Sequence, residues 1–139
     1  MDKADFEKIL RRQLYGIMFH ADAMMIYGVL GMAKQAAEHG KQVLLETKIH
    51  NITALLAAST TGQMPDIGPL QKVEIATPEE IEAAKENVAS KATLHQKITQ
   101  HWHKWEMETR DFYNEYIDID LFRRIRNAVS AECKKASKI

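Results

Sequence analysis

The sequence of 139 residues contains a single cysteine, Cys133, so no disulfide can form within the chain. Chains without disulfides are typical of reducing compartments. The first residues also lack the charged-then-apolar form of a secretion signal, because Glu7, Lys8, Arg11 and Arg12 follow almost at once. We therefore expect a cytoplasmic protein, with Cys133 as a buried and inert thiol on the last helix.

Neither sign of charge is in excess. Lysine plus arginine and aspartate plus glutamate number 19 each, which gives a formal net charge of zero. A protein built to grip nucleic acid phosphates carries a basic excess. The composition therefore argues against nucleic acid as a partner.

No long, purely apolar run is present. The longest nearly uncharged stretch, residues 13–33, contains His20, Asp22 and three glycines. A membrane span needs about 20 predominantly apolar residues. We interpret this stretch as the buried face of a helix, and we expect no membrane partner.

Proline is scarce, and its three occurrences, Pro65, Pro69 and Pro78, lie close together. Elsewhere apolar residues recur every three or four positions, the spacing of one helix face. The sequence predicts an all-α protein of one domain, residues 1–139. Its helices are expected roughly at residues 5–39, 41–59, 78–117 and 120–137.

Two of the expected helix ends depend on particular residues. Gly40 is predicted to end the first helix, because glycine readily adopts the left-handed conformation found there. A break at Gly28 or Gly31 is the alternative, although Val29 and Leu30 make poor turn residues. Threonine, proline and glutamate at positions 77, 78 and 80 form the pattern of a capping box that begins the third helix.

The link between the second and third helices, residues 60–76, is long for a compact domain. At about 3.3 Å per residue it is able to run the whole length of a bundle. Such a link allows the two helices that it joins to be parallel. The sequence therefore predicts a four-helix bundle with one long crossover.

This arrangement resembles the ferritin-like superfamily, which includes ferritin and rubrerythrin. Residues 20–27, HADAMMIY, are similar to the family's first helix, in which a metal-binding acid precedes a core tyrosine by seven residues. His20 stands in the place of that acid. Residues 46–50, ETKIH, resemble the end of the second helix, where the family carries a Glu-x-x-His motif. The resemblance implies a bundle that binds iron or another divalent transition metal.

The sequence departs from the family pattern at several ligands. Thr47 occupies the position where the family spacing expects glutamate, and Glu46 lies four residues before His50 instead of three. The expected last helix contains no histidine, so a second Glu-x-x-His motif is absent. These departures indicate an altered or lost metal site.

Histidines and carboxylates on three expected helices could still supply a mixed metal site, because such ligands suit iron-type ions. Glu46 and His50 are one turn apart and can face the same point. The candidate ligands are His20, Glu46, His50, His101 and Glu108. The simpler interpretation is that these side chains are surface groups or hydrogen-bonded core groups.

The segment HWHKW, residues 101–105, is unusual in composition. It suits a ligand pocket or partner surface, because tryptophan is favoured in both and histidine responds to pH. Alternatively, Trp102 and Trp105 fill the core and His103 points to solvent. Their spacing fits the apolar stripe, which favours the core.

Two functions follow from these observations. The first is a non-enzymatic bundle with a degenerate metal site that acts as a homo-oligomer or partner-binding module. Leu44 and Leu55 support it, because they lie off the apolar stripe of a helix already committed to the core. The second is a metal-binding protein of ferritin or rubrerythrin type. No phosphate-binding loop or nucleophile motif is present, so we do not expect an enzyme.

Overall fold

The described part of the chain is all-helical. The computed structural model describes residues 2–116, 126–127, 130–131 and 134–135. Within them lie four helices, α1 (Lys3–Val29), α2 (Ala33–Thr61), α3 (Pro78–Glu86) and α4 (Val88–Tyr116), and no strand. The all-α prediction is therefore confirmed.

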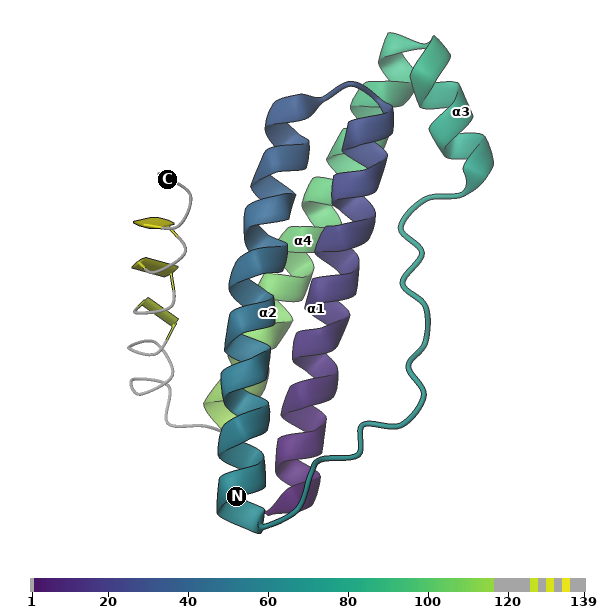
Figure 1. Ribbon diagram of the computed structural model, residues 1–139. Helices are drawn as coiled ribbons and strands as arrows, with labels where there is room; N and C mark the ends of the chain where they lie inside the picture. Colours follow the sequence, from purple (N-terminus) through teal and green to yellow (C-terminus); the bar gives the residue numbers. More distant parts are fainter. Residues whose placement is uncertain (1, 117–125, 128–129, 132–133, 136–139) are drawn as a thin grey trace.

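Helices α1 and α2 form an antiparallel hairpin (Figure 1). Polar contacts between α1 and α4 pair early residues of one with late residues of the other, as in Arg12–Thr109 and Tyr27–His95. Helix α4 therefore also runs antiparallel to α1, and in the same direction as α2. Among the described residues, no helix is long and apolar enough to cross a membrane.

The turn between α1 and α2 corrects one predicted boundary. The first helix ends at Val29, and Gly31 adopts the left-handed conformation with φ of 73°. The Met32 amide donates to the Tyr27 carbonyl and closes the turn. Gly40 lies inside α2, where a β-carbon would come 3.2 Å from Met24 Sδ. This glycine serves the close approach of two helices and does not end one.

A second correction concerns the predicted helix at residues 78–117. It is broken at Asn87, whose backbone is extended. The Asn87 side chain accepts hydrogen bonds from the amides of Ala89 and Ser90, so the break doubles as the start of α4. The predicted capping box at the start of α3 is confirmed, since the Thr77 and Glu80 side chains bond each other's backbone amides.

The predicted last helix, residues 120–137, falls largely outside the described residues, as does Cys133. Within that range, residues 126–127, 130–131 and 134–135 are helical.

Residues 63–77 form no helix and lie along α1 for much of its length (Figure 1). We call this segment the strap. Arg11 Nε donates to the Ile67 carbonyl at 3.0 Å, and farther along the Ile75 amide donates to Asp22 Oδ2 at 3.3 Å. The strap therefore returns the chain from the end of α2 to the start of α3 across one face of α1.

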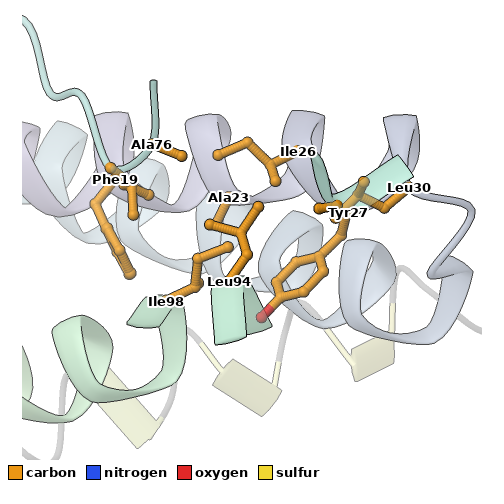
Figure 2. Packing of buried hydrophobic residues seen from close by; sticks show 10 residues of the cluster. Phe19, Ala23, Ile26, Tyr27, Leu30, Ala76, Leu94 and Ile98 are labelled. Carbon is orange, nitrogen blue, oxygen red and sulfur yellow. The ribbon is translucent and has the colours of Figure 1, made fainter. Parts of the chain in front are cut away.

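The main apolar core lies between α1, α4 and the end of the strap. Figure 2 shows Phe19, Ala23 and Ile26 of α1 facing Leu94 and Ile98 of α4. Burial of such side chains contributes about 1.5–3 kcal/mol each and holds α4 against the hairpin.

Gly16 is needed where Trp105 crosses α1. A β-carbon at this position would overlap the indole, lying 2.6 Å from Trp105 Cη2. We expect Gly16→Ala to lower the free energy of unfolding by about 2–3 kcal/mol, because the buried indole cannot move without disturbing the core. Urea denaturation of the purified variant measures the change.

Gly28→Ala is the matched control, since a β-carbon there meets nothing within 4 Å. It should raise the free energy of unfolding by about 0.5–1 kcal/mol through helix propensity alone. Equal effects of the two substitutions would contradict the proposed Trp105 contact.

Candidate functional site

Two buried histidines face each other across the hairpin. His20 of α1 and His39 of α2 are 0% and 3% exposed, and their Nδ1 atoms lie 2.9 Å apart. The early turn at Gly31 brings them together, because α2 then starts soon enough to place His39 beside His20. With a helix end at Gly40, His39 would have been a terminal residue.

The contact requires the accepting ring to be neutral. One Nδ1 must carry the hydrogen and the other must accept it. Burial, followed by the nearby His39 and then Arg126, lowers the pKa of His20 to about 3. Burial also lowers the pKa of His39. The pair is therefore a neutral hydrogen bond at pH 7.

Aromatic rings enclose this pair. Trp102 lies 5.0 Å from the His20 ring and 4.6 Å from the His39 ring, and Tyr27 stacks on His39 at 5.4 Å. Buried polar atoms without a hydrogen-bond partner in the described structure are His20 Nε2, Trp102 Nε1 and Trp105 Nε1. We call His20, His39 and Trp102 the histidine cluster.

Tyr27, which stacks on His39, makes a further contact with α4. Its hydroxyl lies 2.6 Å from His95 Nδ1, and burial raises the pKa of the phenol. A short phenol–imidazole hydrogen bond joins the two helices at this level.

A second polar layer lies lower in the bundle. Gln13 is fully buried, donates to Thr53 Oγ1 at 3.0 Å and accepts from His50 Nδ1 at 3.2 Å. Burial lowers the pKa of His50. His50 thus serves as a hydrogen-bond donor between α1 and α2.

Glu46 belongs to the same layer and is only 2% exposed. Its Oε1 accepts from Arg126 Nη1 at 2.9 Å. Burial raises the pKa of Glu46, although the charge of Arg126 opposes this rise. Burial and the nearby Glu46 together raise the pKa of Tyr113 on α4. The Glu46 carboxylate therefore has its counter-charge, the Arg126 guanidinium, within the same chain.

The other two predicted ligands lie at the surface between α1 and α4. His101 Nε2 lies 3.1 Å from the Tyr15 hydroxyl, and its ring stacks on Phe19 at 4.9 Å. Glu108 pairs with Arg12 at 3.6 Å and with Lys104 at 3.9 Å. His101 therefore links α4 to α1 through Tyr15. Glu108 links α4 to α1 through Arg12, and it links two turns of α4 through Lys104.

The five predicted ligands therefore enter separate contacts. In the part of the chain that the structure describes, no group of three or more His, Cys, Asp or Glu side chains is placed to hold a metal ion. The described side chains do not fit a ferritin-type metal centre.

Sequence reasoning missed His39 and Arg126 as members of the polar layers. His39 becomes the partner of His20 only because the chain turns at Gly31. Arg126 becomes the partner of Glu46 only through the tertiary fold, since the two are 80 residues apart. For the segment at residues 101–105, the structure places Trp105 in the core and leaves His103 exposed. The tryptophans thus fill space, as their spacing favours.

Comparison of the chain with protein-family models, curated proteins and solved structures found no match.

Proposed function

We propose that this chain is a ferritin-like bundle without enzymatic activity, which works by association with a second copy of itself. The first part of this proposal, a bundle without enzymatic activity, rests on the contacts that the predicted metal ligands make. Each is bonded to a neighbouring side chain, most clearly the buried Glu46 to Arg126. These contacts occupy the side chains within the chain, whereas Nε2 of His20 has no partner among the described residues.

The chain path supports the ferritin-like assignment. A tight α1–α2 hairpin is followed by a long strap along α1, after which α4 runs antiparallel to α1. Helices joined by a long crossover are a feature of this superfamily. His20 and Tyr27, seven residues apart, both face the core, as the resemblance implies.

The outward face of α2 is the proposed contact. Leu44 and Leu55 are 42% and 72% exposed. They are eleven residues apart, which is about three turns, so they share one face. An antiparallel pairing about a two-fold axis would set Leu44 of one copy opposite Leu55 of the other. With no net charge, two copies approach without overall repulsion.

Sedimentation velocity at rising concentration tests this contact. We expect the parent chain to dimerise, and Leu44→Gln combined with Leu55→Gln to weaken the dimer by at least about tenfold, because two apolar contacts are lost from each half. Met107→Gln on α4 is the control, since Met107 is also exposed at 54%. A parent chain that stays strictly monomeric at high micromolar concentration would contradict the proposal.

The second candidate is metal binding at the His20–His39 pair, a smaller donor set than the ferritin or rubrerythrin type that the resemblance implies. It rests on the two histidine nitrogens 2.9 Å apart and on the partner-free Nε2 of His20. Elemental analysis of untagged protein after iron and zinc loading tests it. Clearly substoichiometric metal would end this candidate, and it would leave the association proposal untouched.

A further inference from the structure

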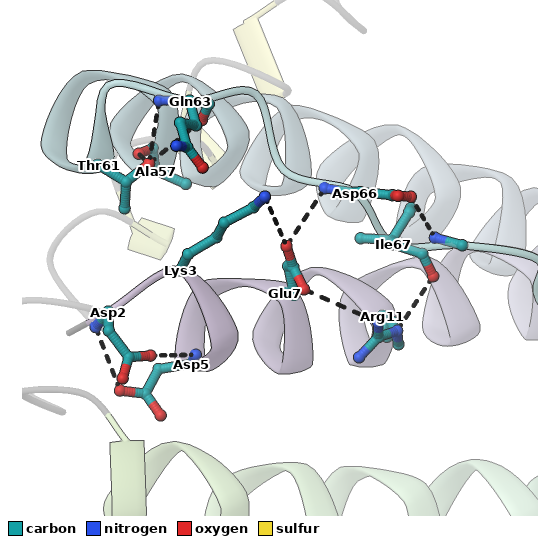
Figure 3. Close-up of polar contacts among 11 residues, drawn as sticks. Asp2, Lys3, Asp5, Glu7, Arg11, Ala57, Thr61, Gln63, Asp66 and Ile67 are labelled. Atoms are coloured by element: carbon teal, nitrogen blue, oxygen red, sulfur yellow. Dashed lines mark hydrogen bonds and ion pairs between the residues drawn. The ribbon is translucent and has the colours of Figure 1, made fainter.

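The strap is attached to α1 by polar contacts at its two ends. At one end the Asp66 amide donates to Glu7 Oε1 and Arg11 donates to the Ile67 carbonyl (Figure 3). At the other end the Ile75 amide bonds Asp22. The anchoring residues Arg11 and Asp22 are three turns apart on one face of α1.

The strap is longer than this distance requires. Eleven residues of helix rise about 16 Å, whereas the eight steps from Ile67 to Ile75 can extend about 26 Å. This length leaves room for the strap to depart from the helix between its anchors, while Val73 packs against the apolar core. A cleft of about 480 Å³ lies beneath it, between residues 69–74, α1 and His101 of α4.

The lining of this cleft includes charged side chains. Arg11 of α1 and Lys72 of the strap line it, with Glu74 as the carboxylate among its lining residues. Arg11 Nε donates to the Ile67 carbonyl, and its guanidinium forms a long ion pair of 4.0 Å with Glu7. Two cations against one carboxylate favour an anionic group.

The remaining lining is apolar or neutral. Met18, Leu70 and Val73 provide aliphatic surface. The side wall is the Tyr15–His101 hydrogen bond, and burial, followed by the charge of Lys104, lowers the pKa of His101. Small-molecule sites of this volume combine an apolar lining with a few placed polar groups. Long loops without secondary structure are commonly functional.

We propose that the strap cleft binds a small organic anion with an apolar body. Arg11 and Lys72 hold the anionic head, and Met18 and Val73 contact the body. The site uses neither Leu44 nor Leu55, so it is independent of the proposed association.

Fluorescence titration with anilinonaphthalene sulfonate, followed by displacement with decanoate, tests the site. We expect saturable binding, displacement by decanoate and much weaker displacement by decanol. Lys72→Gln should weaken binding by about three- to tenfold, because a charge-assisted contact is lost, and Lys72→Arg should restore it. Val73→Asp should abolish binding by placing a second carboxylate in the cleft.

Lys104→Gln is the matched control. Lys104 lines an adjoining cleft of about 240 Å³ that also contains Tyr15 and His101. Binding should be unchanged in this variant. The proposal is overturned by unsaturable binding, by equal displacement with decanol, or by a loss in Lys104→Gln that matches the loss in Lys72→Gln. Circular dichroism of each variant shows that the fold is intact.

Discussion

Replacing Arg126 with alanine should lower the free energy of unfolding by about 2–4 kcal/mol at pH 7, because it leaves a buried carboxylate without its cation. Glu46 is 3% exposed at its side chain, whereas Arg126 is 35% exposed, so the expected loss lies below that of a fully buried pair. Glu46 takes up a proton more readily once the guanidinium is gone. The deficit relative to the parent should therefore shrink as the pH falls toward 5. Denaturant unfolding at several pH values measures this.

The double variant Glu46→Leu with Arg126→Leu separates the cost of a buried carboxylate without its cation from the contribution of the ion pair itself. It removes both charges and should recover most of the stability, since an apolar pair is often as stable as a buried ion pair. Lys85→Ala is the control for an exposed pair, because Lys85–Glu82 lies at the surface, and it should change stability by less than about 1 kcal/mol. A neutral result for Arg126→Ala would show that the Glu46 contact contributes nothing.

Acid should weaken the fold well above the pH at which most carboxylates are protonated. The pKa of His20 is about 3 in the fold and about 6.5 in an unfolded chain, so the unfolded state binds more protons between these values. The stabilisation by neutral His20 is complete above pH 6.5 and is lost progressively toward pH 3. Between pH 8 and pH 5 this residue alone should account for about 2 kcal/mol.

Variants at the histidine cluster test the origin of this pH dependence. His20→Phe should flatten the stability profile between pH 5 and pH 7, because phenylalanine takes up no proton. His103→Gln is the control, since His103 is exposed, and it should leave the profile unchanged. The same slope in His20→Phe as in the parent would assign the acid sensitivity to other residues. His39 and His50, whose pKa values are also lowered by burial, are the next candidates.

Local patterns predicted the elements whose signals lie within a few residues. The capping box at Thr77 is of this kind, since it depends on backbone bonds between near neighbours. The choice between Gly31 and Gly40 could not be made in this way. Gly40 is small because Met24 of another helix packs against it, and that reason lies in tertiary structure.

The polar interior was harder to predict than the helices. On α2, Ile52 and Leu56 lie at helical spacing from Leu45 and Ile49, which predicts one apolar stripe, yet they are 42% and 49% exposed. The centre of the buried face is instead formed by His39, Glu46 and Ile49. Hydrophobic periodicity cannot find a buried face whose members are polar, because their burial depends on partners elsewhere in the chain.

The hydrogen bond between His20 and His39 also fixes how α1 and α2 are aligned along their length. Apolar contacts tolerate a slide of one helix past another, since one aliphatic residue can replace the next. A slide of one turn, about 5.4 Å, would separate the two nitrogens and leave both buried without a partner. The hydrogen-bonded pair therefore selects a single register for the α1–α2 hairpin.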